Sequence, residues 1–183
     1  ISVLSSLLAQ ANELLHFIAL CFFSLGALFY LYIMSLIIYR MSFFELHAEE
    51  LGAPYWINMG ATAITALAGC MLIRSTNQFP LIAEILPFLK GLTLLFWTAG
   101  SWWIPMLILL GIWKHVTKGI KTPINASGYD PSYWSLVFPL GMYTVCTFRL
   151  AETLNLPFLM IIPKYFIFFA LFAWCSVMLG FLR

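Results

Sequence analysis

Charged residues are scarce in this sequence. They make up 9% of its 183 residues, whereas roughly a quarter is usual for a soluble globular domain. With 63% hydrophobic residues and a mean hydropathy of +0.97, the chain is predicted to be an all-α integral membrane protein. The net charge of +2 is small and the basic residues form no run, so a nucleic-acid partner is not expected.

Residues that could carry enzymatic or metal chemistry are few and scattered. The three histidines are far apart, and no pair of histidines or cysteines has the spacing of metal ligands. The sequence also lacks a glycine-rich phosphate loop and a serine in a nucleophile elbow. The four cysteines fall in apolar segments without close pairing, so we expect them to be small buried hydrophobic residues. The sequence therefore predicts no enzyme, no metal and no cofactor.

Five apolar segments are long enough to cross a bilayer at about 1.5 Å of rise per residue. They cover approximately residues 13–39, 55–74, 88–113, 133–153 and 163–182. The first, third and fifth are dense in large side chains and are predicted to face lipid as outer helices. The second and fourth contain more small and polar residues and are predicted to be inner helices.

A repeat relates these segments to one another. Aligning Tyr55 with Tyr133 superposes two units, each an inner helix followed by an outer one, at a period of about 78 residues. The predicted architecture is therefore one outer helix followed by two hairpins, each with an inner and an outer helix.

The second segment carries Asn58, Thr62, Thr65 and Gly69 at spacings of four, three and four. These spacings place them on one face of a helix. The face could be a close-packed interface, because small residues let transmembrane helices approach each other closely. It could equally be the wall of a pore, and the residues alone leave both interpretations open.

The fourth segment contains Pro139, which removes the usual hydrogen-bond partner of the Ser135 carbonyl and so predicts a helix bend. Phe138 precedes this proline, and Gly141 and Thr144 follow within two turns. A bulky ring at a bend, beside a residue with no side chain, has the form of a steric plug. The alternative is that Phe138 simply packs, as most of the seventeen phenylalanines must.

Arg149 and Glu152 are an ionisable pair near the end of the fourth segment. They lie three residues apart on one helix face, so they can neutralise each other. Attraction of anions by Arg149 at the mouth of a pore is the second interpretation.

Two motifs resemble those of a known family. Residues 134–141, WSLVFPLG, resemble the W-S-x-x-F-P-L-G signature in the ninth helix of the tellurite-resistance/C4-dicarboxylate transporter family, which includes the plant slow anion channels. Residues 52–61, GAPYWINMGA, are similar to the entry to the seventh helix of bacterial members. The motifs occur in the family's order and at a plausible separation.

The resemblance implies a ten-helix bundle of five hairpins around a central pore, of which this chain would supply the C-terminal half. It implies transport of small anions or C4-dicarboxylates, with Phe138 as the gate. The residues expected to line the pore are Asn58, Thr62, Thr65, Gly69, Gly141 and Thr144. The alternative function is that of a structural or assembly membrane protein whose helices only pack.

The resemblance also implies a homotrimer in the bacterial inner membrane, with membrane lipid as a further partner and a cytoplasmic C-terminus. The basic residues favour that orientation by a small margin. One side of the membrane would collect Arg40, Lys114, Lys118, Lys121 and Arg183, and the other Arg74, Lys90, Arg149 and Lys164. Asn125-Ala126-Ser127 fits a glycosylation sequon, but its loop is expected in the cytoplasm.

Overall fold

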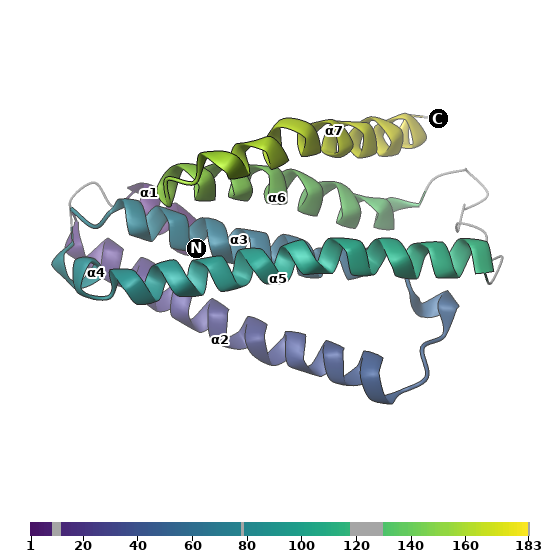
Figure 1. The fold of residues 1–183 in the computed structure, drawn as a ribbon, viewed down its shortest axis with the longest axis horizontal. Coiled ribbons are helices and arrows are strands. Elements are labelled where there is room, and N and C mark those ends of the chain that lie inside the picture. Colours follow the sequence, from purple (N-terminus) through teal and green to yellow (C-terminus); the bar gives the residue numbers. More distant parts are fainter. Residues whose placement is uncertain (9–11, 78, 118–129, 183) are drawn as a thin grey trace.

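The computed structural model describes residues 1–8, 12–77, 79–117 and 130–182. Lys118, Lys121, Arg183 and the sequon at residues 125–127 lie outside this range. The described residues form helices and short turns without a β-strand (Figure 1). The helices are α1 (Ser2–Leu8), α2 (Glu13–Phe43), α3 (Ile57–Arg74), α4 (Pro80–Glu84), α5 (Leu86–Ile112), α6 (Trp134–Thr153) and α7 (Ile161–Phe181).

Local sequence signals set several of the helix ends. The Asn12 side chain accepts hydrogen bonds from the backbone N–H groups of Leu14 and Leu15, which caps α2. The turn between α6 and α7 ends α6 through Asn155, whose φ of 54° lies in the left-handed region. The next residue, Leu156, donates its backbone N–H to the Ala151 carbonyl at 2.9 Å. These bonds satisfy backbone groups that a helix end leaves unpaired.

Within the described residues, four helical stretches are long and apolar enough to cross a membrane. They are Glu13–Phe43, Ala53–Arg74, Leu86–Val116 and Pro157–Phe181. The stretch that contains α3 is 61% buried, against 17%, 22% and 11% for those that contain α2, α5 and α7. Thus α3 is an inner helix and the other three are outer helices. α6 is not among the four stretches, because proline, arginine and glutamate lower its hydropathy.

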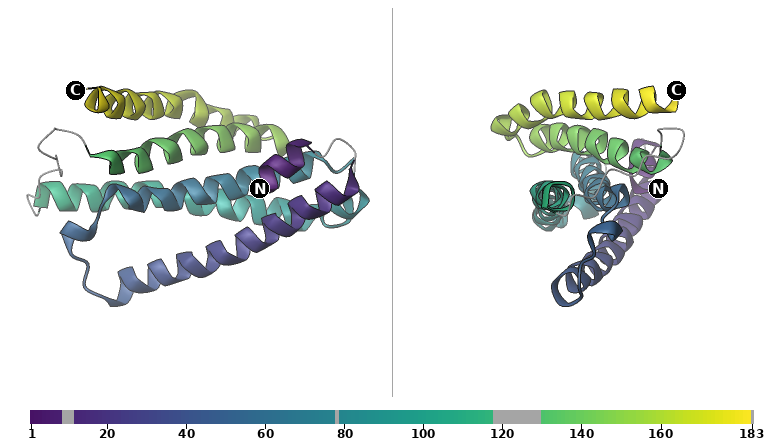
Figure 2. Two further views of the ribbon diagram at one scale, coloured as in Figure 1. Left: turned by 180° about the vertical axis from the view of Figure 1, so that it is seen from behind. Right: turned by 90° about the vertical axis from the view of Figure 1, so that its right-hand side faces the viewer.

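The inner helices lie between the outer ones. α3 packs against α2, α5 and α6, and α6 packs against α7. The end-on view in Figure 2 shows α7 and α6 as successive layers, followed by α3 with α5 at its side, and α2 beyond them. The order along the chain is therefore the predicted one, with large lipid-facing helices around helices rich in small residues.

Glycines let α3 approach its neighbours at very short range. A Cβ atom on Gly60 would lie 2.9 Å from Cγ of Pro139 in α6. A Cβ atom on Gly69 would lie 2.0 Å from Oγ1 of Thr93 in α5, and one on Gly100 would lie 2.6 Å from Oγ1 of Thr62. A larger residue at any of these three positions would force a neighbouring side chain or helix to shift.

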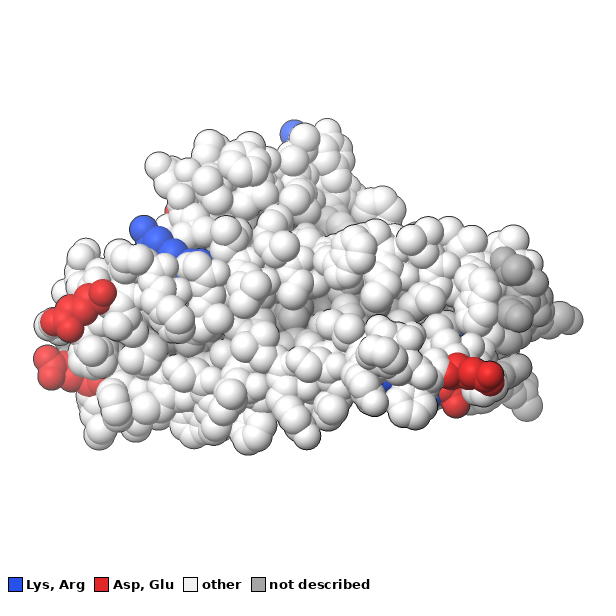
Figure 3. All heavy atoms as spheres, turned by 60° about the horizontal axis from the view of Figure 1, so that its bottom comes forward, with Lys and Arg blue, Asp and Glu red and all other residues white. Residues whose placement is uncertain are grey.

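The surface is largely apolar. In the view of Figure 3, acidic side chains lie at the two ends of the bundle, and between them is a broad band with few charged side chains, most of them basic. Such a band is what a membrane-spanning protein presents to acyl chains. The prediction that all four cysteines are buried is wrong for Cys21 and Cys175, which are exposed on the lipid-facing helices α2 and α7. Cys70 and Cys146 are buried.

Replacement of Gly60 by alanine tests the contact between α3 and α6. Alanine favours a helix by about 1 kcal/mol over glycine, but its Cβ would overlap a proline ring that cannot rotate away. We expect Gly60→Ala to lose about 1–3 kcal/mol of stability and to lower the thermal unfolding midpoint in detergent. Gly141→Ala is the matched control, because nothing lies within 4 Å of its added Cβ. Equal unfolding midpoints for the two variants would contradict the contact.

Candidate functional site

One face of α6 is open. Phe138, Val145 and Phe148 recur there at spacings of seven and three residues, and all three side chains are exposed. The Phe138 side chain is 57% exposed, although it belongs to a helix whose other faces are buried against α3 and α7. Gly141 lies on the same face, with no atom within 4 Å of the position its Cβ would take. No other described element covers this face.

A groove of about 560 Å³ adjoins this face. Phe138 and Met142 line it from α6, and Ile64, Thr65, Leu67 and Ala68 line it from α3. Residues 1–4 and parts of α2 form the remaining walls. Of the predicted site residues, Phe138 and Thr65 thus line one groove, which is mainly apolar.

Two other residues of the predicted polar face of α3, Thr62 and Gly69, do not line the groove. Thr62 is 1% exposed, donates its hydroxyl to the Met59 carbonyl at 2.8 Å, and packs against Gly100 of α5. Gly69 packs against Thr93 of α5. These two residues match the close-packed interface that the sequence left open as an alternative to a pore wall.

Asn58 and Thr144 also lie outside the groove walls. The Asn58 side chain is half-buried, and its backbone carbonyl accepts a hydrogen bond from the Tyr30 hydroxyl of α2. Thr144 is buried and donates its hydroxyl to the Leu140 carbonyl of its own helix at 2.9 Å. Pro139 is buried against Gly60 inside the continuous helix α6, so its role as a bend stays a prediction.

A charged cluster lies where α3 and α6 end. The predicted pair is present, with Nη1 of Arg149 at 3.1 Å from Oε2 of Glu152. Nη1 of Arg74, from α3, lies 3.3 Å from the same oxygen. Two guanidinium groups thus share one carboxylate, which leaves one positive charge. Arg74 was missed as a partner, although the period of 78 residues aligns it with Glu152.

A second feature that sequence reasoning missed is a polar network between α5 and α6. Trp97 donates its indole N–H to Oγ1 of Thr147 at 3.0 Å, and Thr147 donates to the Tyr143 carbonyl at 2.8 Å. The Tyr143 hydroxyl lies 2.7 Å from Oγ of Ser101. The spacing of four between Tyr143 and Thr147 was the available signal. The network joins an inner helix to an outer one through groups that lipid could not satisfy.

Metal chemistry has no visible basis in the described part of the chain. Among those residues, no group of three or more His, Cys, Asp or Glu side chains is placed to hold a metal ion.

Thr147→Val tests the polar network. Valine keeps the shape of threonine but removes the acceptor of the Trp97 N–H, so a buried donor loses its partner. We expect a loss of about 1–2 kcal/mol, measured as a lower unfolding midpoint in detergent. Thr144→Val is the control, because the Thr144 hydroxyl bonds only to a carbonyl of its own helix. If Thr144→Val proves as destabilising as Thr147→Val, the contact between helices contributes nothing beyond burial.

Comparisons with known proteins agree with this architecture. A family model described as voltage-dependent anion channel matches residues 1–182. An uncharacterized membrane protein of Mycobacterium tuberculosis is 37% identical over 145 residues, which are 79% of this chain and 71% of that protein. Two uncharacterized transporters of Methanocaldococcus jannaschii are 31% and 32% identical, over 69% and 67% of this chain but only 34% and 33% of their own length. No solved structure gives a significant match.

Proposed function

The chain belongs to the voltage-dependent anion channel family, and we propose that its inner helices α3 and α6 line a path along which small anions cross the membrane. Members of this family are channels or transporters and not enzymes, so transport of anions is the general function. The open face of α6 carries the proposal for the path. Phe138 is exposed on this face of a helix whose other faces pack against α3 and α7, and it lies beside a groove that Thr65 also lines.

Phe138 is the gate in this proposal. Its ring projects into the groove beside Gly141, where no side chain competes for space. An apolar ring at a constriction excludes a hydrated ion and also resists wetting. Displacement of this one side chain would open the path.

The path would hold anions only weakly. The Thr65 hydroxyl donates to the Ala61 carbonyl at 2.9 Å and can reorient toward a passing ion. The positive cluster formed by Arg74, Arg149 and Glu152 raises the anion concentration at one end. Weak binding along a path suits rapid passage, since an ion must leave as easily as it enters. In this proposal Thr62, Gly69 and Thr144 pack behind the residues that line the path and hold the helices in place.

Two helices cannot enclose a pore, so further helices must complete it. The two relatives named as transporters are about three times as long as the segments that match this chain. We infer that the chain corresponds to the C-terminal half of a ten-helix subunit, in which α6 is the fourth of the five spans that this chain supplies. Assembly as a trimer, a bacterial inner membrane and a cytoplasmic C-terminus complete this proposal. The cargo is a small inorganic anion or a C4-dicarboxylate.

The second candidate is a membrane protein that assembles without transport. The contacts of Gly69 with Thr93 and of Gly100 with Thr62 favour it, because they are pure packing. It gives no reason for the open face that carries Phe138. Anion flux through the complete protein separates the two candidates.

Phe138→Ala tests the gate. In liposomes that contain the complete protein, we expect the variant to raise the flux of chloride or of a dicarboxylate such as succinate severalfold, because the obstructing ring is gone. Phe172→Ala is the control, since Phe172 is 75% exposed on the outer helix α7. A folded Phe138→Ala variant with unchanged or lower flux would remove the gate assignment. No flux in any variant would favour the second candidate.

Glu152→Gln tests the charged cluster. The change leaves Arg74 and Arg149 without their shared carboxylate and adds one positive charge near the end of the path. We expect anion flux to increase severalfold at low ionic strength and the difference to vanish near 1 M salt, where the Debye length is about 3 Å. Glu50→Gln is the control, because Glu50 pairs with Arg40 outside the groove. Flux that does not respond to Glu152→Gln at low salt would argue against electrostatic attraction there.

A further inference from the structure

A buried lysine lies at the opposite end of the bundle from the arginine cluster. Lys114 is 6% exposed, and its Nζ donates to the Leu51 carbonyl at 2.5 Å. None of the ion pairs found in the described part of the chain includes it. Because a buried ammonium group is costly without a counter-charge, its retention calls for an anion nearby.

Lys114 lines a partly open pocket of about 200 Å³, which we call the Lys114 pocket. Three parts of the chain form its walls: residues 51–56 before α3, residues 107–115 at the end of α5, and residues 132–136 at the start of α6. A water molecule needs only about 10–15 Å³ of such space. The pocket therefore has room for an ion with several heavy atoms.

The walls are divided by polarity. Leu107, Leu110 and Leu136 form an apolar part, and Lys114, Ser132 and Tyr133 bring polar groups. Burial, and to a lesser extent the charge of Asp130, raise the pKa of the Tyr133 phenol above its ordinary value. At neutral pH this phenol stays protonated and can donate a hydrogen bond.

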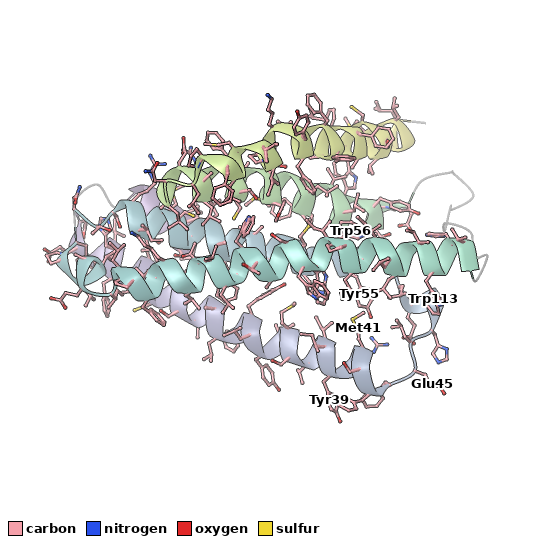
Figure 4. All side chains as sticks on the ribbon, viewed as in Figure 1. Tyr39, Met41, Glu45, Tyr55, Trp56 and Trp113 are labelled. Carbon is pink, nitrogen blue, oxygen red and sulfur yellow. The ribbon has the colours of Figure 1, made fainter. Side chains whose placement is uncertain are left out.

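A single π-helical turn, Trp113–Thr117, continues α5 and carries Lys114, and such turns are frequent at functional sites. On the facing wall, the Tyr55 carbonyl accepts a hydrogen bond from the Trp103 indole at 3.0 Å. Figure 4 labels Tyr55, Trp56 and Trp113 toward this end of the bundle.

Two described carboxylates near this end, those of Glu50 and Asp130, have other partners. Glu50 pairs with Arg40, and the Asp130 side chain accepts the backbone N–H of Ser132 at 2.8 Å. The ammonium group of Lys114 has three N–H donors, and the Leu51 carbonyl uses one of them. Among the described residues no acceptor is bonded to the other two donors, which are available to a ligand in the pocket.

We propose that the Lys114 pocket binds a small anionic group, a carboxylate or a phosphate, with Lys114 as its counter-ion. The leucine wall contacts the apolar part of the ligand, and Tyr133 donates a second hydrogen bond. This site is separate from the groove beside Phe138 and does not depend on the transport path. The group belongs either to a soluble anion or to the head of an anionic lipid, since both offer the same charged oxygens.

Binding to the purified complete protein tests the proposal. In nonionic detergent at constant ionic strength, sodium butyrate and sodium phosphate are titrated by calorimetry. In parallel, phosphatidylglycerol and phosphatidylcholine are compared by native mass spectrometry. Saturable binding of butyrate or phosphate identifies a soluble anion, and selective retention of phosphatidylglycerol identifies a lipid head group. If neither butyrate nor phosphate binds and phosphatidylglycerol is not retained selectively, the proposal is overturned.

Two variants locate the binding. Lys114→Met keeps the length and apolar stem of lysine but removes its charge, so binding should weaken about tenfold or more. Lys90→Met is the matched control, because Lys90 is exposed at the other end of the same helix. If Lys114→Met does not fold, Gly111→Leu replaces it. Gly111 lines the pocket and has no atom within 4 Å of an added Cβ, so leucine fills the space without a clash at its Cβ. If Lys114→Met, or Gly111→Leu in its place, binds the ligand with wild-type affinity, the proposal is overturned.

Discussion

The fold depends on how closely α3 can approach its neighbours. In a membrane, apolar side chains gain little by leaving lipid for protein, so helices associate through tight packing and hydrogen bonds. Gly60 meets Pro139 of α6, and Gly69 meets Thr93 of α5. With α3 held between α5 and α6, and α6 held between α3 and α7, the face of α6 that carries Phe138 stays open. The groove beside Phe138 is therefore a consequence of packing elsewhere on the same helices.

The class of fold and the order of inner and outer helices were predictable from composition. Large side chains all around a helix indicate contact with lipid, and small ones indicate contact with protein, without any knowledge of the partner. The partner of a given face was not predictable. Thr62 and Gly69 lie against α5 because Gly100 and Thr93 leave space for them, and those residues lie at least 24 positions away in the sequence. The ion pair of Glu152 with Arg149 on the same helix was predicted. The second pair, with Arg74, was not, because Arg74 comes from another helix.

No charged side chain lines the described part of the groove. The arginine cluster lies at one end of the bundle and Lys114 at the other, while the groove walls between them are apolar residues with the hydroxyls of Ser2 and Thr65. In the proposed path, an anion would meet a favourable field at the arginine cluster and only weak contacts along the groove. Conduction needs this combination, because a buried cation on the path would hold the ion too tightly.

The short turn after α6 has a mechanical consequence. Asn155 reverses the chain in the left-handed conformation, and the bond from Leu156 to Ala151 ties the turn to the last helical residues. The connection between α6 and α7 is therefore short and tied to the end of α6. If α6 slides by even one residue, about 1.5 Å, α7 must follow it through the lipid. Any motion that displaces the ring of Phe138 by moving its backbone is thus a motion of the whole hairpin, and bilayer thickness and tension would act on it directly.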